Sequence, residues 1–151
     1  MHTGDNAVPR PAYTRPVIHL TPEQHVFVTE RHLATLTTLR PDGSPHVVPV
    51  GFTWDPDLGV LRVTTRDGST KVRNVERGTS PGSGAPVALC QVEGGRWLTF
   101  EGTMVVSRDP EEIADAMRRY AVRYRHLEPD PRRIVLRLTV ERVLGSDYMT
   151  R

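Results

Sequence analysis

The chain has a single cysteine, Cys90, among its 151 residues. A disulfide within the chain is therefore excluded, and so is a metal centre built from several cysteines. We expect Cys90 to be a small core residue, because it lies in an apolar segment typical of a strand. Long hydrophobic runs are also missing, and no signal-peptide core follows Met1. These absences predict a cytoplasmic protein without a membrane anchor.

The chain also has little excess charge and lacks the motifs of several large enzyme classes. Its net charge of +2 is lower than is typical of a dedicated nucleic-acid-binding protein. There is no Walker A loop, no three-glycine dinucleotide fingerprint and no serine in a nucleophile elbow. The histidines are scattered without metal-ligand spacing, so no metal site is expected. If the protein is an enzyme, a bound cofactor must supply the chemistry.

Alternating apolar and polar residues, separated by short turns, dominate the chain after residue 20. They predict six strands, at 33–39, 46–54, 60–65, 86–92, 96–106 and 133–144. Capping residues, prolines and helical spacing predict helices at 21–30, 69–77 and 109–124. The first three strands should form an antiparallel meander. We therefore expect a flexible tail at 1–20 and one mainly-β domain at 21–151, a closed antiparallel barrel with short helices.

The junction between the third strand and the following helix is the most informative segment. Asp67 and Gly68 end the strand, and Ser69 or Thr70 can cap the helix, which carries Lys71 in its first turn. A hydroxyl, a lysine and the free N–H groups of a helix N-terminus favour a bound phosphate. The alternative is an ordinary capped turn with solvated charges.

A group of arginines marks the helix at 109–124 and the chain that follows it. Its members are Arg118, Arg119, Arg123, Arg125, Arg132 and Arg133. The default interpretation is a solvated helix face. The functional alternative is a surface that docks a ligand carrying carboxylates or phosphates, because guanidinium groups bind both in a bidentate manner.

Several runs of the sequence resemble a known family. They are Arg31 to Phe52, the segment Ser69-x-Lys71-x-x-Asn74, Gln91 to Gly102, and the closing strand up to Gly145. These segments are similar to the split-barrel flavin and deazaflavin oxidoreductases related to pyridoxamine 5′-phosphate oxidase. Ser-Pro-His-Val-Val at 44–48, Arg-Trp-Leu at 96–98 and Arg-Tyr-Ala-x-Arg-Tyr-Arg at 119–125 most resemble the actinobacterial branch that uses coenzyme F420, biliverdin reductases in particular. Arg66, Pro49 and the 78–84 loop depart from it.

The resemblance implies a homodimer of six-stranded split barrels with cofactor sites along the dimer interface. The resemblance also implies that Ser69, Lys71 and Asn74 bind the coenzyme phosphate, with Thr64, Thr65 and Arg66 beside them. The deazaflavin ring is expected against the backbone of His46, Val47, Val48, Pro49 and Val50. Gln91, Arg96 and Trp97, from the same chain or its partner, complete the implied pocket, although core packing is an equal alternative for Trp97.

The resemblance also implies an activity, namely hydride transfer from reduced F420 to a conjugated acceptor, with biliverdin reduced to bilirubin as the first candidate. Arg118 and Arg125 would meet the substrate's carboxylates. Two alternatives stay open: an FMN-dependent oxidase or reductase on the same barrel, and a non-enzymatic protein that binds a cofactor or haem.

Overall fold

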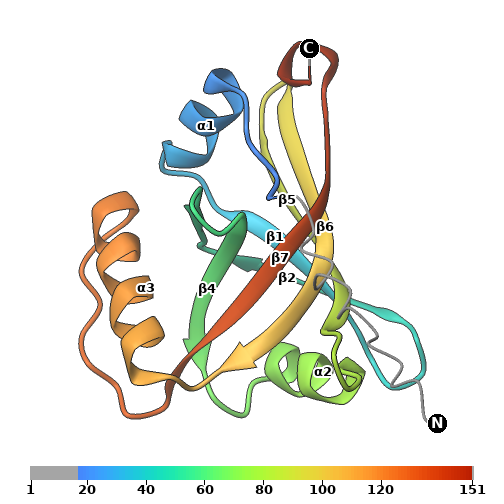
Figure 1. Ribbon diagram of the computed structural model, residues 1–151, viewed down its shortest axis with the longest axis vertical. Coiled ribbons are helices and arrows are strands. Elements are labelled where there is room, and N and C mark those ends of the chain that lie inside the picture. Colours follow the sequence, from blue (N-terminus) through green and yellow to red (C-terminus); the bar gives the residue numbers. More distant parts are fainter. Residues whose placement is uncertain (1–16, 151) are drawn as a thin grey trace, which may run out of the picture.

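The computed structural model describes residues 17–150 and contains one antiparallel sheet of seven strands. Three α-helices and a short 3₁₀ helix surround the sheet (Figure 1). The strands are β1 (Ala34–Leu39), β2 (Pro45–Val50), β3 (Thr53–Asp55), β4 (Val60–Arg66), β5 (Ala85–Glu93), β6 (Arg96–Ser107) and β7 (Arg133–Gly145). The helices are α1 (Pro22–Thr29), α2 (Thr70–Gly78), α3 (Pro110–Arg123) and η1 (Asp147–Met149). The three helices and the mainly-β fold predicted from the sequence are confirmed.

The sheet has the order β2-β1-β5-β6-β7-β4-β3, and its two edge strands follow each other in the sequence. Only Gly51 and Phe52 separate β2 from β3. The sheet therefore has to curl until its two edges approach each other. Within the described strands no hydrogen-bonded ladder joins β2 to β3, so the barrel is split along this line.

The closed barrel predicted from the sequence was therefore wrong, and so were two further details of that prediction. The segment 46–54 forms two strands, because Gly51 and the fully buried Phe52 carry the chain from one edge of the sheet to the other. Gly51 is required at the crossing, since an added Cβ would lie 2.8 Å from the ring of Tyr120. The predicted antiparallel meander of the first three strands was also wrong. β2 pairs only with β1, at one edge of the sheet, whereas β3 and β4 lie at the other edge.

The core fills the inside of the curled sheet. Phe52 and Phe100 are fully buried there, with ring centroids 6.2 Å apart. Helix α2 closes one end by burying Val72 and Val75. Ile18 and Leu20 also pack against this core, so packed structure begins before residue 21, whereas residues 1–16 of the expected tail lie outside the described residues. Cys90, predicted to be a core residue, is only half-buried, because it lies on the face of β5 opposite Leu89.

No helix in the described part of the chain is long and apolar enough to cross a membrane.

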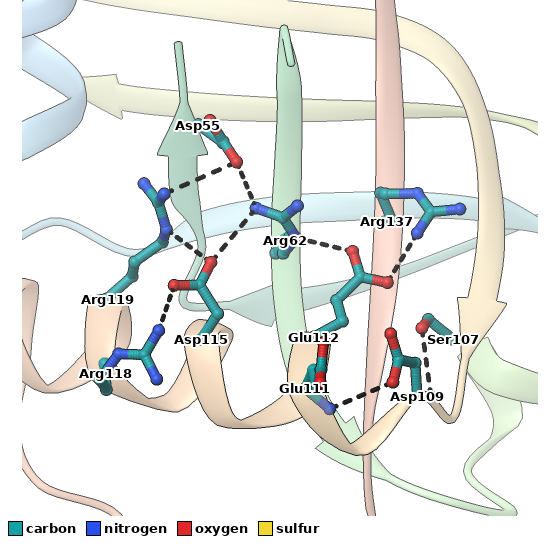
Figure 2. A network of polar contacts seen from close by, with 10 residues as sticks. All are labelled: Asp55, Arg62, Ser107, Asp109, Glu111, Glu112, Asp115, Arg118, Arg119 and Arg137. Carbon is teal, nitrogen blue, oxygen red and sulfur yellow. Dashed lines mark hydrogen bonds and ion pairs between the residues drawn. The ribbon is translucent and has the colours of Figure 1, made fainter. Parts of the chain in front are cut away.

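Helix α3 is attached to the sheet mainly by charged groups. Its only fully buried residue is Ala116, so its apolar face at Ile113 and Met117 is no more than half-buried. Arg62 of β4 lies beneath it with 6% of its side chain exposed. Its guanidinium lies 2.8 Å from Asp55 and 2.8 Å from Glu112 (Figure 2). β4 was expected to alternate between buried and exposed side chains, but Arg62, at one of the positions expected to be exposed, belongs to a buried ion cluster.

The ion cluster extends to a second layer of arginines (Figure 2). Glu112 also accepts a 2.6 Å hydrogen bond from Arg137 of β7, and Arg119 lies 2.9 Å from Asp115. Burial opposes ionisation of Asp55 and Glu112 and is the largest single influence on each. Hydrogen bonds and nearby arginine charges together outweigh it, so the pKa of both carboxyls lies below its ordinary value.

Stability should therefore fall in acid. A carboxyl whose native pKa is lowered stabilises the fold above its unfolded-state pKa, and this contribution is lost as the pH falls through the native pKa. We expect the free energy of unfolding, measured in urea, to drop most steeply below about pH 4, where ordinary carboxyls titrate. An Arg62→Met variant should show a shallower drop. An equal drop in both proteins would contradict this account of the cluster.

Candidate cofactor site

The turn between β4 and α2 leads into a helix N-terminus, a position where proteins commonly bind anions. Gly68 adopts a φ of +82°, which favours glycine, and Ser69 occupies the N-cap position of α2. The Ser69 side chain makes no capping hydrogen bond, and its Oγ is buried without a partner among the described residues. A buried hydroxyl without a partner is costly, so a ligand that hydrogen-bonds to it would be favoured.

Lys71 lies in the first turn of α2 and is half-buried. It forms no ion pair within residues 17–150, and burial lowers the pKa of its ammonium group. A cation that has lost part of its hydration without gaining a carboxylate partner is suited to binding an anion.

Asn74 lies one turn after Lys71, on the same face of α2. It is buried, and its Nδ2 donates a 3.0 Å hydrogen bond to Oγ1 of Thr38 in β1. Thr38 is the cross-strand partner of His46, whose Nδ1 is buried without a hydrogen-bond partner among the described residues. The structure therefore brings the first turns of α2 to the beginning of β2. Thr38 was not identified from the sequence, because a threonine in a strand gives no signal of its role.

The other predicted residues of β2 and β4 alternate between the two faces of the sheet. In β2, Val48 and Val50 are on the more buried face with His46, and Val47 and Pro49 are exposed on the other face. In β4, Thr65 is buried on the core side.

Thr64 and Arg66 are on the opposite face of β4 from Thr65. Arg66 is mostly exposed and forms a 3.0 Å ion pair with Asp130.

Gln91, Arg96 and Trp97 lie near the β5–β6 turn. The end of the sheet that carries this turn lies opposite the end covered by α2 (Figure 1). Gln91 is fully buried and donates a 2.8 Å hydrogen bond to the carbonyl oxygen of Phe27. Arg96 forms an ion pair with Glu30 at 2.7 Å, and Trp97 is 36% exposed on the outer face of the sheet. Within one chain, these three residues therefore lie at the end of the sheet away from Lys71.

The arginine cluster expected from the sequence is divided in space. Arg118 and Arg119 both pair with Asp115, at 2.7 Å and 2.9 Å, and Arg118 is largely exposed. Arg125 is exposed, whereas Arg123 points inward and binds backbone oxygens. The surface candidates for ligand binding are thus Arg118 and Arg125.

Arg132 and Arg133 follow α3 in the chain and form a separate part of the arginine group expected from the sequence. Arg132 donates a hydrogen bond to the backbone oxygen of Asp67, and Arg133 donates one to that of Glu128. The contact between Arg132 and Asp67 holds the chain before β7 near the β4–α2 turn.

The 78–84 loop, which departs from the family pattern, borders a groove of about 430 Å³ on the outer face of β6 and β7. Ser80 and Ser83 pair with each other across the loop, and Gly82 has a φ of +77°. The opposite wall carries Thr103 and Thr139. The loop therefore changes the surface of the sheet at a place separate from Lys71.

Away from α3, the outer face of the sheet is partly apolar, and no helix within residues 17–150 buries it. Thr35, Cys90, Thr99 and Leu144 are successive cross-strand neighbours on β1, β5, β6 and β7, and none is buried. Val92 lies on the same face and is more than half exposed.

Comparison with known proteins identifies the family to which this fold belongs. The profile of the pyridoxamine 5′-phosphate oxidase family matches residues 20–147. An F420H(2)-dependent biliverdin reductase of Mycobacterium tuberculosis is 53% identical over 120 residues, which cover 80% of this chain and 83% of that protein.

Solved structures share the fold at lower identity. A conserved hypothetical protein of Mycobacterium tuberculosis has a TM-score of 0.70 at 22% identity, with 89% of each chain covered. A structure described as an F420 reductase has a TM-score of 0.61 at 24% identity and covers 80% of this chain and 94% of its own. The resemblance inferred from the sequence is confirmed, and the chain belongs to the pyridoxamine 5′-phosphate oxidase family.

Proposed function

We propose that this protein is an oxidoreductase that transfers a hydride from reduced coenzyme F420 to a conjugated acceptor, with biliverdin as the substrate. The observation that carries the proposal is the 53% identity to the F420H(2)-dependent biliverdin reductase, spread over 80% of the chain. At this identity the fold and most site residues are expected to be shared, whereas the acceptor depends on a smaller number of contacts.

The residues at the β4–α2 junction fit an anionic coenzyme. The buried Oγ of Ser69 has no partner within residues 17–150, Lys71 has no ion pair there, and both lie at the positive end of the α2 dipole. Ser69 and Lys71 would hold the coenzyme phosphate, and Asn74 would fix the helix against β1 through Thr38.

β2 suits the role of a backbone wall for the ring. It is an edge strand, so one side of its backbone is free of ladder hydrogen bonds and can meet a ligand. Pro49 lacks an N–H and is tolerated on such a strand. When bound, reduced F420 supplies the hydride, and the chain's own residues hold, orient and shield the reacting pair.

A homodimer is part of the proposal. The exposed apolar face around Cys90 and Leu144 is suited to a twofold partner, because isologous contacts pair a surface with itself. A partner chain can also bring a second Arg96 and Trp97 to the Lys71 end, which one chain cannot, whereas Gln91 is fully buried within its own chain.

The dimer can be tested by placing a charge on this face. Leu144→Asp should shift the protein from dimer to monomer in sedimentation velocity, because an unpaired carboxylate would be buried in the interface. Val122→Asp, on the exposed side of α3, serves as the matched control and should remain dimeric. A monomeric parent protein, or a dimeric Leu144→Asp protein, would contradict this interface.

Activity is tested by following the oxidation of reduced F420 in the presence of biliverdin. We expect turnover with biliverdin and bilirubin as the product, and no turnover when the acceptor is omitted. Binding of F420 without turnover of biliverdin or of other conjugated acceptors would contradict the proposed reaction.

A further inference from the structure

A cavity of about 330 Å³ lies between α1, β3 and α3. Its volume is at the lower end of the range of about 300–1,000 Å³ that is usual for small-molecule sites. Its walls include apolar groups from all three elements: Val28 from α1, Trp54 from β3 and Val122 from α3. None of the residues expected to bind the coenzyme lines it, and neither Arg118 nor Arg125 does.

Arg123 lines this cavity, and its guanidinium lies over the rings of Phe52 and Tyr124, at 4.4 Å and 4.9 Å from their centroids, without a carboxylate partner among the described residues. Its guanidinium donates hydrogen bonds to the backbone oxygens of Glu30, His32 and Phe52 and to Oε1 of Gln91, at 2.6–3.3 Å. All four acceptors are neutral, and Arg123 forms no ion pair with any residue in 17–150. Burial lowers the pKa of this guanidinium, yet an arginine stays charged in proteins.

One hydrogen-bond donor of Arg123 is left over. A guanidinium has five N–H groups, and the four bonds within the described chain leave one N–H on Nη1 without an acceptor. The other arginine of the cavity, Arg119, is already paired with Asp115 at 2.9 Å. Arg123 is thus the charge at this cavity that lacks an anion.

A second polar group of the cavity also lacks a partner. Thr53 is 6% exposed, and its Oγ1 is buried with no hydrogen-bond partner among the described residues. The cavity therefore combines apolar walls, one positive charge that no carboxylate of residues 17–150 pairs with, and one hydroxyl without a hydrogen-bond partner. An anion with an apolar body would complement all three.

We propose that this cavity binds an amphipathic carboxylate, with the apolar body against Val28 and Trp54 and the carboxylate at Arg123. Such a site is separate from the proposed F420 site and goes beyond the proposed function. The carboxylate would accept the remaining N–H of Arg123 and neutralise its charge, which no group of the described chain does.

The test is calorimetric titration of the full chain with octanoate, with octanol and acetate as the two partial probes. Octanoate should bind with one site per chain, and octanol and acetate should each bind at least about tenfold more weakly, because each lacks one half of the interaction. Equal affinity for octanol would overturn the role of Arg123. Equal affinity for acetate would overturn the apolar part. Absence of octanoate binding would overturn the whole proposal.

A pair of variants at the cavity rim locates the site. Val122 is 90% exposed, so its substitution should leave the fold intact. Val122→Asp should weaken octanoate binding about tenfold by charge repulsion, whereas Val122→Asn should weaken it far less. Val26→Asp on the exposed surface of α1, outside the cavity, should have no effect. If both aspartate variants behave alike, the ligand binds elsewhere. F420 binding should be unchanged in all three, which keeps this test independent of the proposed activity.

Discussion

Replacing Lys71 with alanine should weaken the binding of coenzyme F420 at least about tenfold. A charge-assisted hydrogen bond to a phosphate contributes about 1.5–3 kcal/mol, and a tenfold change corresponds to about 1.4 kcal/mol. Lys71 is suited to this contact because it is half-buried at the N-terminus of α2 with no ion pair in the described chain. Fluorescence titration of the coenzyme measures the effect.

The same variant should not be less stable. Burial lowers the pKa of Lys71, which means that the folded apo-protein disfavours its charge. Removing the charge should therefore leave the free energy of unfolding unchanged or raise it slightly. Weaker binding together with undiminished stability would distinguish a binding residue from a structural one.

Arg73→Ala is the matched control for Lys71→Ala. Arg73 is exposed and lies two residues further along α2, on another face of the helix. Its removal deletes the same charge and should change F420 affinity much less than tenfold. Unchanged affinity in Lys71→Ala, or an equal loss in Arg73→Ala, would refute the phosphate assignment.

Replacing Arg62 with methionine should lower the free energy of unfolding by about 3–5 kcal/mol. Methionine keeps much of the length of the side chain but leaves Asp55 and Glu112 buried without their shared partner. Removing one member of a buried ion pair typically costs this much, because the remaining charge stays desolvated. Urea unfolding monitored by circular dichroism measures the change.

Arg142→Met provides the comparison for Arg62→Met. Arg142 is exposed and lies 4.0 Å from Glu101, so its loss should cost no more than about 1 kcal/mol. A similar small effect at Arg62 would mean that α3 is attached to the sheet by its half-buried apolar face and not by ions.

An element of the fold could be predicted where the sequence pattern that specifies it lies within the element itself. The cap at Thr21 and the proline that follows it identify α1, and both capping-box hydrogen bonds are present in the structure. The break between β2 and β3 was missed because Phe52 and its neighbours continue the strand pattern. The need for a glycine there comes from a distant residue, because an added Cβ at Gly51 would lie 2.8 Å from the ring of Tyr120.

Charged residues show the limit of local reasoning more clearly. Arg62 occupies a position that alternation assigns to a solvent-facing side chain, and only the packing of α3 buries it. Glu112 lies in the first turn of α3, where an acidic residue favours the helix dipole, and it also accepts hydrogen bonds from Arg62 and Arg137. The periodicity of one segment does not show which residues far away in the sequence will form hydrogen bonds or ion pairs with it.

The candidate site was predictable where it depends on one continuous segment. Ser69, Lys71 and Asn74 are close because they share the start of one helix, and the sequence indicated this directly. Gln91 and Arg96 came from the family resemblance, and their contacts with Phe27 and Glu30 depend on how α1 packs against the sheet. No local pattern contains that information.

The central claim is that the β4–α2 junction holds the phosphate of F420 in a reductase of this family. Its most direct test is a side-by-side binding titration of the purified protein with F420, FMN and NADPH. The account predicts that F420 binds more tightly than FMN and that NADPH does not bind. Tighter binding of FMN, or its retention through purification with no measurable affinity for F420, would contradict the account.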